Sequence, residues 1–173
     1  MMWKCWSKSL GPLFMKAKTS LLVGVWLLLF CSSASAENFI YEDAYSGSVI
    51  TIDTVNSTLS FLDITSRAEI CSSQSDFICF ESKQLVFAIP KLIDGNSAEW
   101  EYKGHVFKNE GLYEFSILGQ KVSAYSIKSE VDALGLKFLY SSSQGLLGFY
   151  LYDLQSRFGR AYYAVDSKGF GQP

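Results

Sequence analysis

The sequence is poor in the side chains on which most catalytic and metal sites depend. It has a single histidine, His105, so a site built from several imidazole ligands is excluded. Of its four cysteines, only Cys71 and Cys79 lie beyond residue 36. Neither a G-x-S-x-G motif nor an S-x-x-K arrangement occurs. We therefore expect no catalytic centre, no bound metal and no cofactor.

Acidic side chains are absent from the first 36 residues, which carry four lysines. An apolar run from Leu21 to Cys31 follows these lysines, and an A-x-A sequence ends at Ala36, just before Glu37. The run has 11 residues, whereas a membrane-spanning helix needs about 20. We predict a signal peptide over residues 1–36 that is cleaved between Ala36 and Glu37, leaving no integral membrane span. Met15 is an alternative start, because Met15 to Ala36 is itself a compact signal.

The remaining 137 residues, 37–173, carry eleven basic and seventeen acidic side chains, a net charge of −6 against −2 for the whole chain. They contain no cluster of lysine or arginine of the kind that nucleic acids and anionic membrane surfaces require. We therefore expect no nucleic-acid partner. The length predicts one mature domain, and the signal predicts export to the periplasm or the extracellular space.

Cys71 and Cys79 are eight residues apart, and in an oxidising compartment two such cysteines most simply form one disulfide. Closing so short a loop stabilises the fold by about 2.5 kcal/mol on the chain-entropy model. A free reactive thiol is the competing interpretation. One disulfide supplements the hydrophobic core but does not replace it.

Long helical periods are absent after residue 37, and apolar and polar residues alternate instead, most clearly over Ala98–Lys103. Turn signals separate ten to twelve short segments. The pattern predicts an all-β domain, an antiparallel sandwich or a small barrel, which alternation cannot distinguish. Short helical turns are expected over Ser129–Gly135 and from Asp153 to Phe158, and a loose tail from Gly169.

Two carboxylates, Glu99 and Glu101, project on the same face of a predicted strand. A hydrolase acting on an extracytoplasmic polymer would need such a pair in contrasting environments across a cleft. A solvated outer face opposite Trp100 and Tyr102 is the simpler interpretation. His105 is expected at the surface or in a turn.

Aromatic residues supply the candidate partner-binding positions, which are Tyr150, Tyr152, Tyr162 and Tyr163. They lie in two segments that are apolar on both faces, so each segment is either covered on both sides or exposes an aromatic patch. Core packing is the competing interpretation. The sequence therefore predicts an exported, non-catalytic binding or structural module of the envelope, whose partner is a small molecule or an envelope protein. A carboxylate-dependent hydrolase is the alternative.

Overall fold

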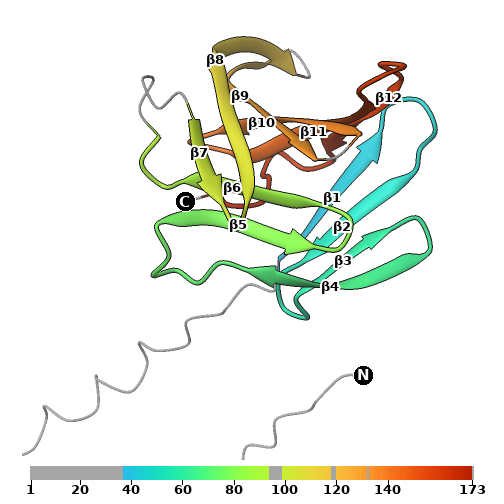
Figure 1. Ribbon diagram of the computed structural model, residues 1–173, viewed down its shortest axis with the longest axis horizontal. Helices are drawn as coiled ribbons and strands as arrows, with labels where there is room; N and C mark the ends of the chain where they lie inside the picture. The colour runs from blue at the N-terminus through green and yellow to red at the C-terminus, as the bar shows by residue number, and fades with distance from the viewer. Residues whose placement is uncertain (1–36, 94–98, 118–119, 132, 173) are drawn as a thin grey trace, which may run out of the picture. The chain divides into compact units, whose positions relative to one another are not determined.

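Alternating side chains produce twelve antiparallel strands in the computed structural model, which describes residues 37–93, 99–117, 120–131 and 133–172 (Figure 1). The strands are β1 (Asn38–Asp43), β2 (Val49–Asp53), β3 (Thr58–Phe61), β4 (Ile64–Ile70), β5 (Phe77–Ser82), β6 (Val86–Pro90), β7 (Glu99–Tyr102), β8 (His105–Ile117), β9 (Gln120–Val131), β10 (Leu134–Ser141), β11 (Gly145–Asp153) and β12 (Gly159–Ala164). These described residues contain no helix, so the all-β prediction is confirmed. The predicted export segment, including Ala36, lies outside them.

The strands form one sheet in the order β6-β5-β4-β3-β2-β1-β12-β11-β10-β9-β8-β7. Every pairing but one joins strands that are consecutive in the sequence, and the remaining pairing joins the first strand to the last. There, β1 pairs with β12 through Tyr41 opposite Ala164 and Asp43 opposite Tyr162. The sheet curls until its two edge strands, β6 and β7, lie beside each other (Figure 1). The sheet is nearly closed and barrel-like, so of the two predicted architectures the barrel is the one observed.

Side chains join the two edges of the sheet where the described residues show no backbone pairing. The Trp100 indole on β7 donates a hydrogen bond of 2.9 Å to the Ala88 carbonyl on β6. The Lys103 ammonium lies 2.6 Å from carboxylate oxygens of both Glu69 and Glu81. These contacts hold the seam without the regular ladder that links the other strands.

Aromatic rings fill the interior of the barrel. Among the close pairs are Phe87 with Phe138 at 5.0 Å and Tyr41 with Phe149 at 5.2 Å between ring centroids. Tyr162 is fully buried and stacks on Phe149 at 5.3 Å. Tilted and edge-on pairs of this kind pack densely and stabilise by more than their buried area alone. The interior is therefore a packed core rather than a channel.

The C-terminal segment is part of that core, so the expectation of a loose tail is wrong. Phe170 is only 4% exposed and meets the rings of Phe39 and Phe80 edge-on at 5.6 and 5.2 Å. Its backbone amide donates to the Tyr41 hydroxyl at 3.0 Å, and that hydroxyl donates to the Leu146 carbonyl at 3.0 Å. An aromatic side chain buried on several sides outweighs the flexibility of the glycines beside it.

An aspartate shapes the turn in three of the hairpins in the same way. The carboxylates of Asp43, Asp53 and Asp153 each accept two backbone amides from the loop that follows, at 2.6–3.1 Å. The expected short helix from Asp153 to Phe158 is therefore wrong: this segment is the loop between β11 and β12. Aspartate oxygens satisfy backbone amides in turns as readily as at helix starts.

The helical turn expected over Ser129–Gly135 is also wrong. β9 continues to Val131 and pairs with the start of β10 at Leu134, which places a hairpin there. Ser129 is buried, and its hydroxyl donates to the Val106 carbonyl on β8 at 2.8 Å. Three-stranded pairing therefore overrides the local helical tendency of this segment.

The aspartate turns predict acid sensitivity. Backbone hydrogen bonds hold the pKa values of Asp43, Asp53 and Asp153 below the ordinary aspartate range. A lowered pKa in the folded state stabilises the fold above the unfolded pKa, near 3.9. That stability is lost as the pH falls through the folded values. We expect urea midpoints to decline below about pH 4, and to decline less in the triple aspartate-to-asparagine variant. Parallel declines in the two proteins would contradict this.

Candidate ligand site at the mouth of the barrel

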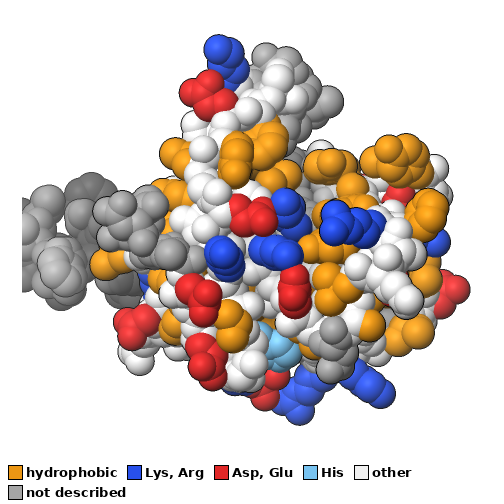
Figure 2. Space-filling view, turned by 45° about the horizontal axis from the view of Figure 1, so that its top comes forward, with side chains coloured by type: hydrophobic (Ala, Val, Ile, Leu, Met, Phe, Trp, Pro, Cys, Tyr) orange, Lys and Arg blue, Asp and Glu red, His pale blue; other side chains and the backbone are white. Residues whose placement is uncertain are grey.

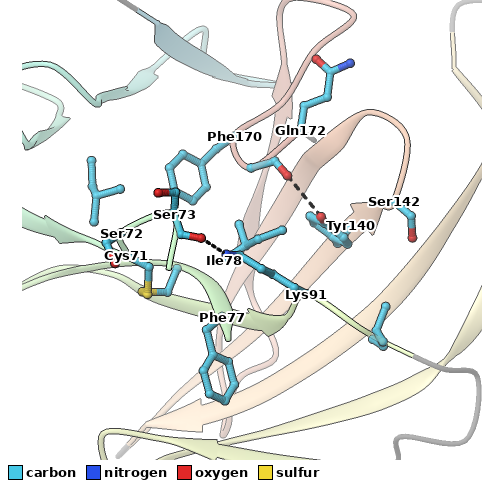
Figure 3. Close-up of a pocket in the computed structure, with 14 residues that line it drawn as sticks. Cys71, Ser72, Ser73, Phe77, Ile78, Lys91, Tyr140, Ser142, Phe170 and Gln172 are labelled. Atoms are coloured by element: carbon cyan, nitrogen blue, oxygen red, sulfur yellow. Dashed lines mark hydrogen bonds between the residues drawn. A yellow bond between two sulfur atoms is a disulfide. The ribbon is translucent and has the colours of Figure 1, made fainter. Parts of the chain in front are cut away.

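A cavity of about 530 Å³ opens at the end of the barrel where β4 ends and β5 begins (Figure 3). Its apolar lining comes from both sides of the fold: Ile70, Phe77, Ile78, Ile93, Tyr140 and Phe170. Serine, lysine and glutamine side chains supply the polar lining. The volume lies within the range of small-molecule sites, about 300–1,000 Å³. We call this space the mouth cavity.

The predicted disulfide lies in one wall of the mouth cavity. Cys71 follows β4 and Cys79 is on β5; the two are bonded, with Cα atoms 5.2 Å apart. The Cys71 amide also donates to the Cys79 carbonyl at 3.1 Å, and the Tyr102 hydroxyl lies 3.1 Å from the Cys79 Sγ. The covalent link fixes both ends of the loop that carries Ser72 and Ser73. The wall is therefore preorganised before any ligand arrives.

The opposite wall is the C-terminal segment, held by its own contacts. The Tyr140 hydroxyl donates to the Gly171 carbonyl at 3.2 Å (Figure 3), and the Gln172 side-chain amide donates to the Ser143 carbonyl at 3.2 Å. Gly171 has φ +77°, and a Cβ there would overlap Ile78. Burial raises the pKa of the Tyr140 hydroxyl, which keeps it neutral. The segment presents a fixed surface to the mouth cavity.

Lys91 is the one cation that lines the mouth cavity among the described residues. It follows the last residue of β6, and its backbone amide donates to the Asp76 carbonyl at 2.9 Å. Its side chain crosses the opening, where the ammonium donates to the Ser73 carbonyl (Figure 3). An ammonium group has three donors, so the contact to Ser73 leaves two for a ligand. Apolar walls and one cation at the rim suit a ligand with an apolar body and an acidic group.

The described residues offer little for covalent or metal chemistry. They contain no group of three or more histidine, cysteine, aspartate or glutamate side chains placed to hold a metal ion. Glu99 and Glu101 are exposed on β7, and neither lines the mouth cavity. His105 begins β8, directly after the turn at Lys103 and Gly104. The arrangement can bind and orient a molecule, and it places no paired carboxylates across a cleft.

The four tyrosines singled out in the sequence separate into three environments. Tyr150 and Tyr152 lie on the outer face of β11 with stacked rings, Tyr163 is 44% exposed on β12, and Tyr162 is fully buried. Tyr162 therefore belongs to the core, and the other three remain candidates for a partner. None of the four lines the mouth cavity.

Sequence reasoning missed the residues that shape the mouth cavity, apart from its disulfide. Ile78 on β5 and Lys91 after β6 come from paired strands, and Phe170 joins them only through the fold. The pair of glycines around Phe170 was the available signal, because glycine often marks a close approach of two backbones.

On the face drawn in Figure 2, acidic and basic side chains are interspersed rather than gathered by sign. Among the described residues no helix is long and apolar enough to cross a membrane. No family model matches the chain, and no curated protein or solved structure is significantly similar to it.

Proposed function

We propose that the protein is a non-catalytic binding module that acts outside the cytoplasm and holds a small amphipathic molecule in the mouth cavity. The observation that carries this proposal is the cavity itself, about 530 Å³ with mainly apolar walls. The apolar body of the ligand would contact Ile78, Phe77 and Phe170. An acidic group on the ligand would face the Lys91 ammonium at the rim.

Three features support binding at this place. The mouths of β-barrels are frequent ligand sites, because the strands hold the walls while the loops leave an opening. The disulfide and the Tyr140 contact fix the two walls, which lowers the entropy lost on binding. The disulfide also supports the proposed location, since such bonds persist in oxidising compartments outside the cytoplasm.

Decanoate and decanol test the chemistry, because they share an apolar chain and differ in charge. We expect decanoate to bind more tightly by about two- to fivefold, as an exposed ion pair contributes roughly 0.2–1 kcal/mol. Lys91→Met should remove this preference and leave decanol binding unchanged. Lys83→Met is the matched control, since Lys83 is exposed in the loop between β5 and β6. Isothermal titration calorimetry of both ligands with the unchanged protein and the two variants measures all six combinations.

Blocking the opening tests the place of binding. Ser142 lines the mouth cavity and is exposed, so Ser142→Trp should obstruct entry without disturbing the core. We expect both probes to bind at least about tenfold more weakly, the effect of losing ~1.4 kcal/mol of apolar contact. Ser123→Trp, at an exposed position of β9, is the control. If both tryptophan variants bind like the unchanged protein, or if neither probe binds at all, the proposal is wrong.

A further inference from the structure

A second concave surface lies on the outside of the barrel, away from the mouth cavity. Lys128, Glu130, Lys137, Tyr150, Tyr152 and Arg157 line it, and its volume is about 460 Å³. These residues come from β9, β10, β11 and the loop after β11. We call this surface the outer groove. It carries three basic side chains and one acidic one, on a domain whose net charge is negative.

The floor of the outer groove is a pair of tyrosine rings. Tyr150 and Tyr152 are two residues apart on β11, and their rings stack at 5.2 Å with an angle of 17°. Glycines on the neighbouring strands make room for these rings. A Cβ at Gly135 would overlap the Tyr152 ring, and a Cβ at Gly159 would lie 2.8 Å from Tyr150 Cζ. The sheet is thus shaped to hold two half-buried aromatic rings on its outer face.

Two lysines lie side by side in the outer groove in an unfavourable arrangement. Lys128 on β9 is directly opposite Lys137 on β10. Like charges at directly opposed positions destabilise a pair of strands. Glu130 lies 2.6 Å from Lys128, and Glu110 lies 2.8 Å from Lys137, which offsets part of the repulsion. The hydrogen bond to Glu130 also raises the pKa of Lys128, so this side chain stays charged at neutral pH.

Arg157 occupies a backbone position that suits glycine. Its φ is +58°, and its amide donates to the Asp153 carbonyl at 2.8 Å. The equivalent residues in the other two aspartate turns are Gly47, with φ +66°, and Ser57, with φ +51°. A side chain at such a position costs conformational energy, and strain of this kind gathers at functional sites. The Tyr150 hydroxyl donates to the Arg157 carbonyl at 3.3 Å, which ties this loop to the tyrosine floor.

We propose that the outer groove binds an anionic saccharide. A sugar ring would pack its C–H face on Tyr150 and Tyr152, and its carboxylate or sulfate would accept hydrogen bonds from Lys128, Lys137 and Arg157. The opposed lysines and Arg157, which has a positive φ, both line this one surface. Such departures from local preference are expected where a site is built. The inference does not depend on the mouth cavity, which opens elsewhere on the barrel.

The charge distribution favours a saccharide over a nucleic acid. A nucleic acid carries a charge at every residue and rewards a long basic track. The outer groove offers three cations, and seventeen acidic residues in the domain oppose a polyanion. A saccharide with one acidic group per ring matches so few cations, and its C–H faces suit aromatic rings that are already stacked on each other.

Four probes distinguish the ligand classes, with the protein purified in the form that the cell accumulates. These are trigalacturonate as the carboxylated saccharide, a heparin-derived disaccharide as the sulfated one, neutral maltotriose, and a ten-residue oligothymidylate. We expect one or both acidic saccharides to bind at least about tenfold more tightly than maltotriose, because their carboxylates or sulfates pair with the three cations. Tighter binding of the oligothymidylate, or equal binding of maltotriose, overturns the proposal.

Substitutions locate the site. Tyr152→Ala should weaken binding of the acidic saccharide by about tenfold or more, the usual effect of losing an aromatic contact. Tyr163→Ala is the matched control, because Tyr163 is 44% exposed on β12 and does not line the outer groove. Equal losses in the two variants would exclude the outer groove as the site. Ser142→Trp at the mouth cavity should leave saccharide binding unchanged, so that failure of one proposal does not imply failure of the other.

Arg157→Gly gives the sharpest test, because its two expected effects have opposite signs. Removing the strained side chain should raise the melting temperature by about 2–4 °C. The same change should weaken saccharide binding by about three- to tenfold, since it removes a charged donor. Unchanged binding would show that the arginine serves no ligand. A lower melting temperature would show that its side chain supports the fold, which also contradicts the proposal.

Discussion

Replacing Phe170 with alanine is expected to lower the free energy of unfolding by about 3–5 kcal/mol, the usual effect of removing a buried phenylalanine ring. Phe170 is 4% exposed and contacts rings from three strands: Phe39 at 5.6 Å, Phe80 at 5.2 Å and Phe87 at 6.4 Å. Alanine would leave a void between these rings, because strands locked in a closed sheet cannot move in to fill it. Such a loss is a large part of the free energy of unfolding of a typical domain.

Urea unfolding followed by tyrosine and tryptophan fluorescence measures the effect of Phe170→Ala. Phe158→Ala is the matched control, because Phe158 is 84% exposed in the loop after β11. Its substitution should change stability by no more than about 0.5 kcal/mol. If the two variants unfold at the same urea concentration, the C-terminal segment is not part of the core. If Phe170→Ala does not fold at all, a Phe170→Leu variant with a smaller loss keeps the comparison measurable.

Tyr41→Phe is expected to lower the free energy of unfolding by about 2–4 kcal/mol, although the two side chains differ by one oxygen. The Tyr41 hydroxyl donates to the Leu146 carbonyl and accepts from the Phe170 amide, at 3.0 Å in both cases. Phenylalanine would preserve the packing against Phe149 and leave two buried backbone groups without this partner. Unsatisfied buried groups cost more than the hydrogen bond itself contributes.

The same variant changes the response to alkali. Burial raises the pKa of Tyr41 far above its ordinary value near 10. A raised pKa in the folded state stabilises the fold below the unfolded pKa, and this stability is lost as the pH rises through and beyond that value. The unchanged protein should therefore lose stability steadily above about pH 10. Tyr41→Phe should lose less over the same interval, and identical alkaline slopes would contradict the assignment.

Local pattern was enough to find the strands and not enough to find how the sheet closes. Strands such as β1 and β2 have one face on the core, so their apolar residues recur at every second position and the elements can be read directly. Closure depends on contacts such as Trp100 with Ala88 and Lys103 with Glu81, which join distant segments and leave no local mark. For that reason the sandwich and the barrel could not be separated from the sequence.

Two of the three errors in local structure come from residues whose local preference allows more than one structure. Asp153 accepts backbone amides, which is what an aspartate does at the start of a helix, but here the chain turns back and β12 pairs with β11. Gly169 and Gly171 suggest a flexible segment in the sequence. In the structure, neighbouring atoms occupy the space that a side chain at either position would need. A Cβ at Gly169 would overlap the Leu146 backbone, and one at Gly171 would overlap Ile78.

The candidate sites were predictable only in part. The disulfide followed from the cysteine count, and the aromatic strands pointed to Tyr150 and Tyr152. The partners of these residues could not be foreseen, because Lys128 and Lys137 reach the tyrosines through the order of strands β9, β10 and β11. Lys91 follows β6, and its ammonium is held at the mouth cavity by Ser73 in the loop between β4 and β5.

The pairing of β1 with β12 sets the time at which this protein can fold. A ribosome makes β1 early and Phe170 more than a hundred residues later, yet Phe170 and β12 complete the core around Tyr41. Until β12 has been made, one edge of β1 is unpaired and its aromatic side chains are exposed to water. Sheets closed by such distant contacts fold in milliseconds to seconds. The order of synthesis therefore keeps this core incomplete until the C-terminal segment has been made.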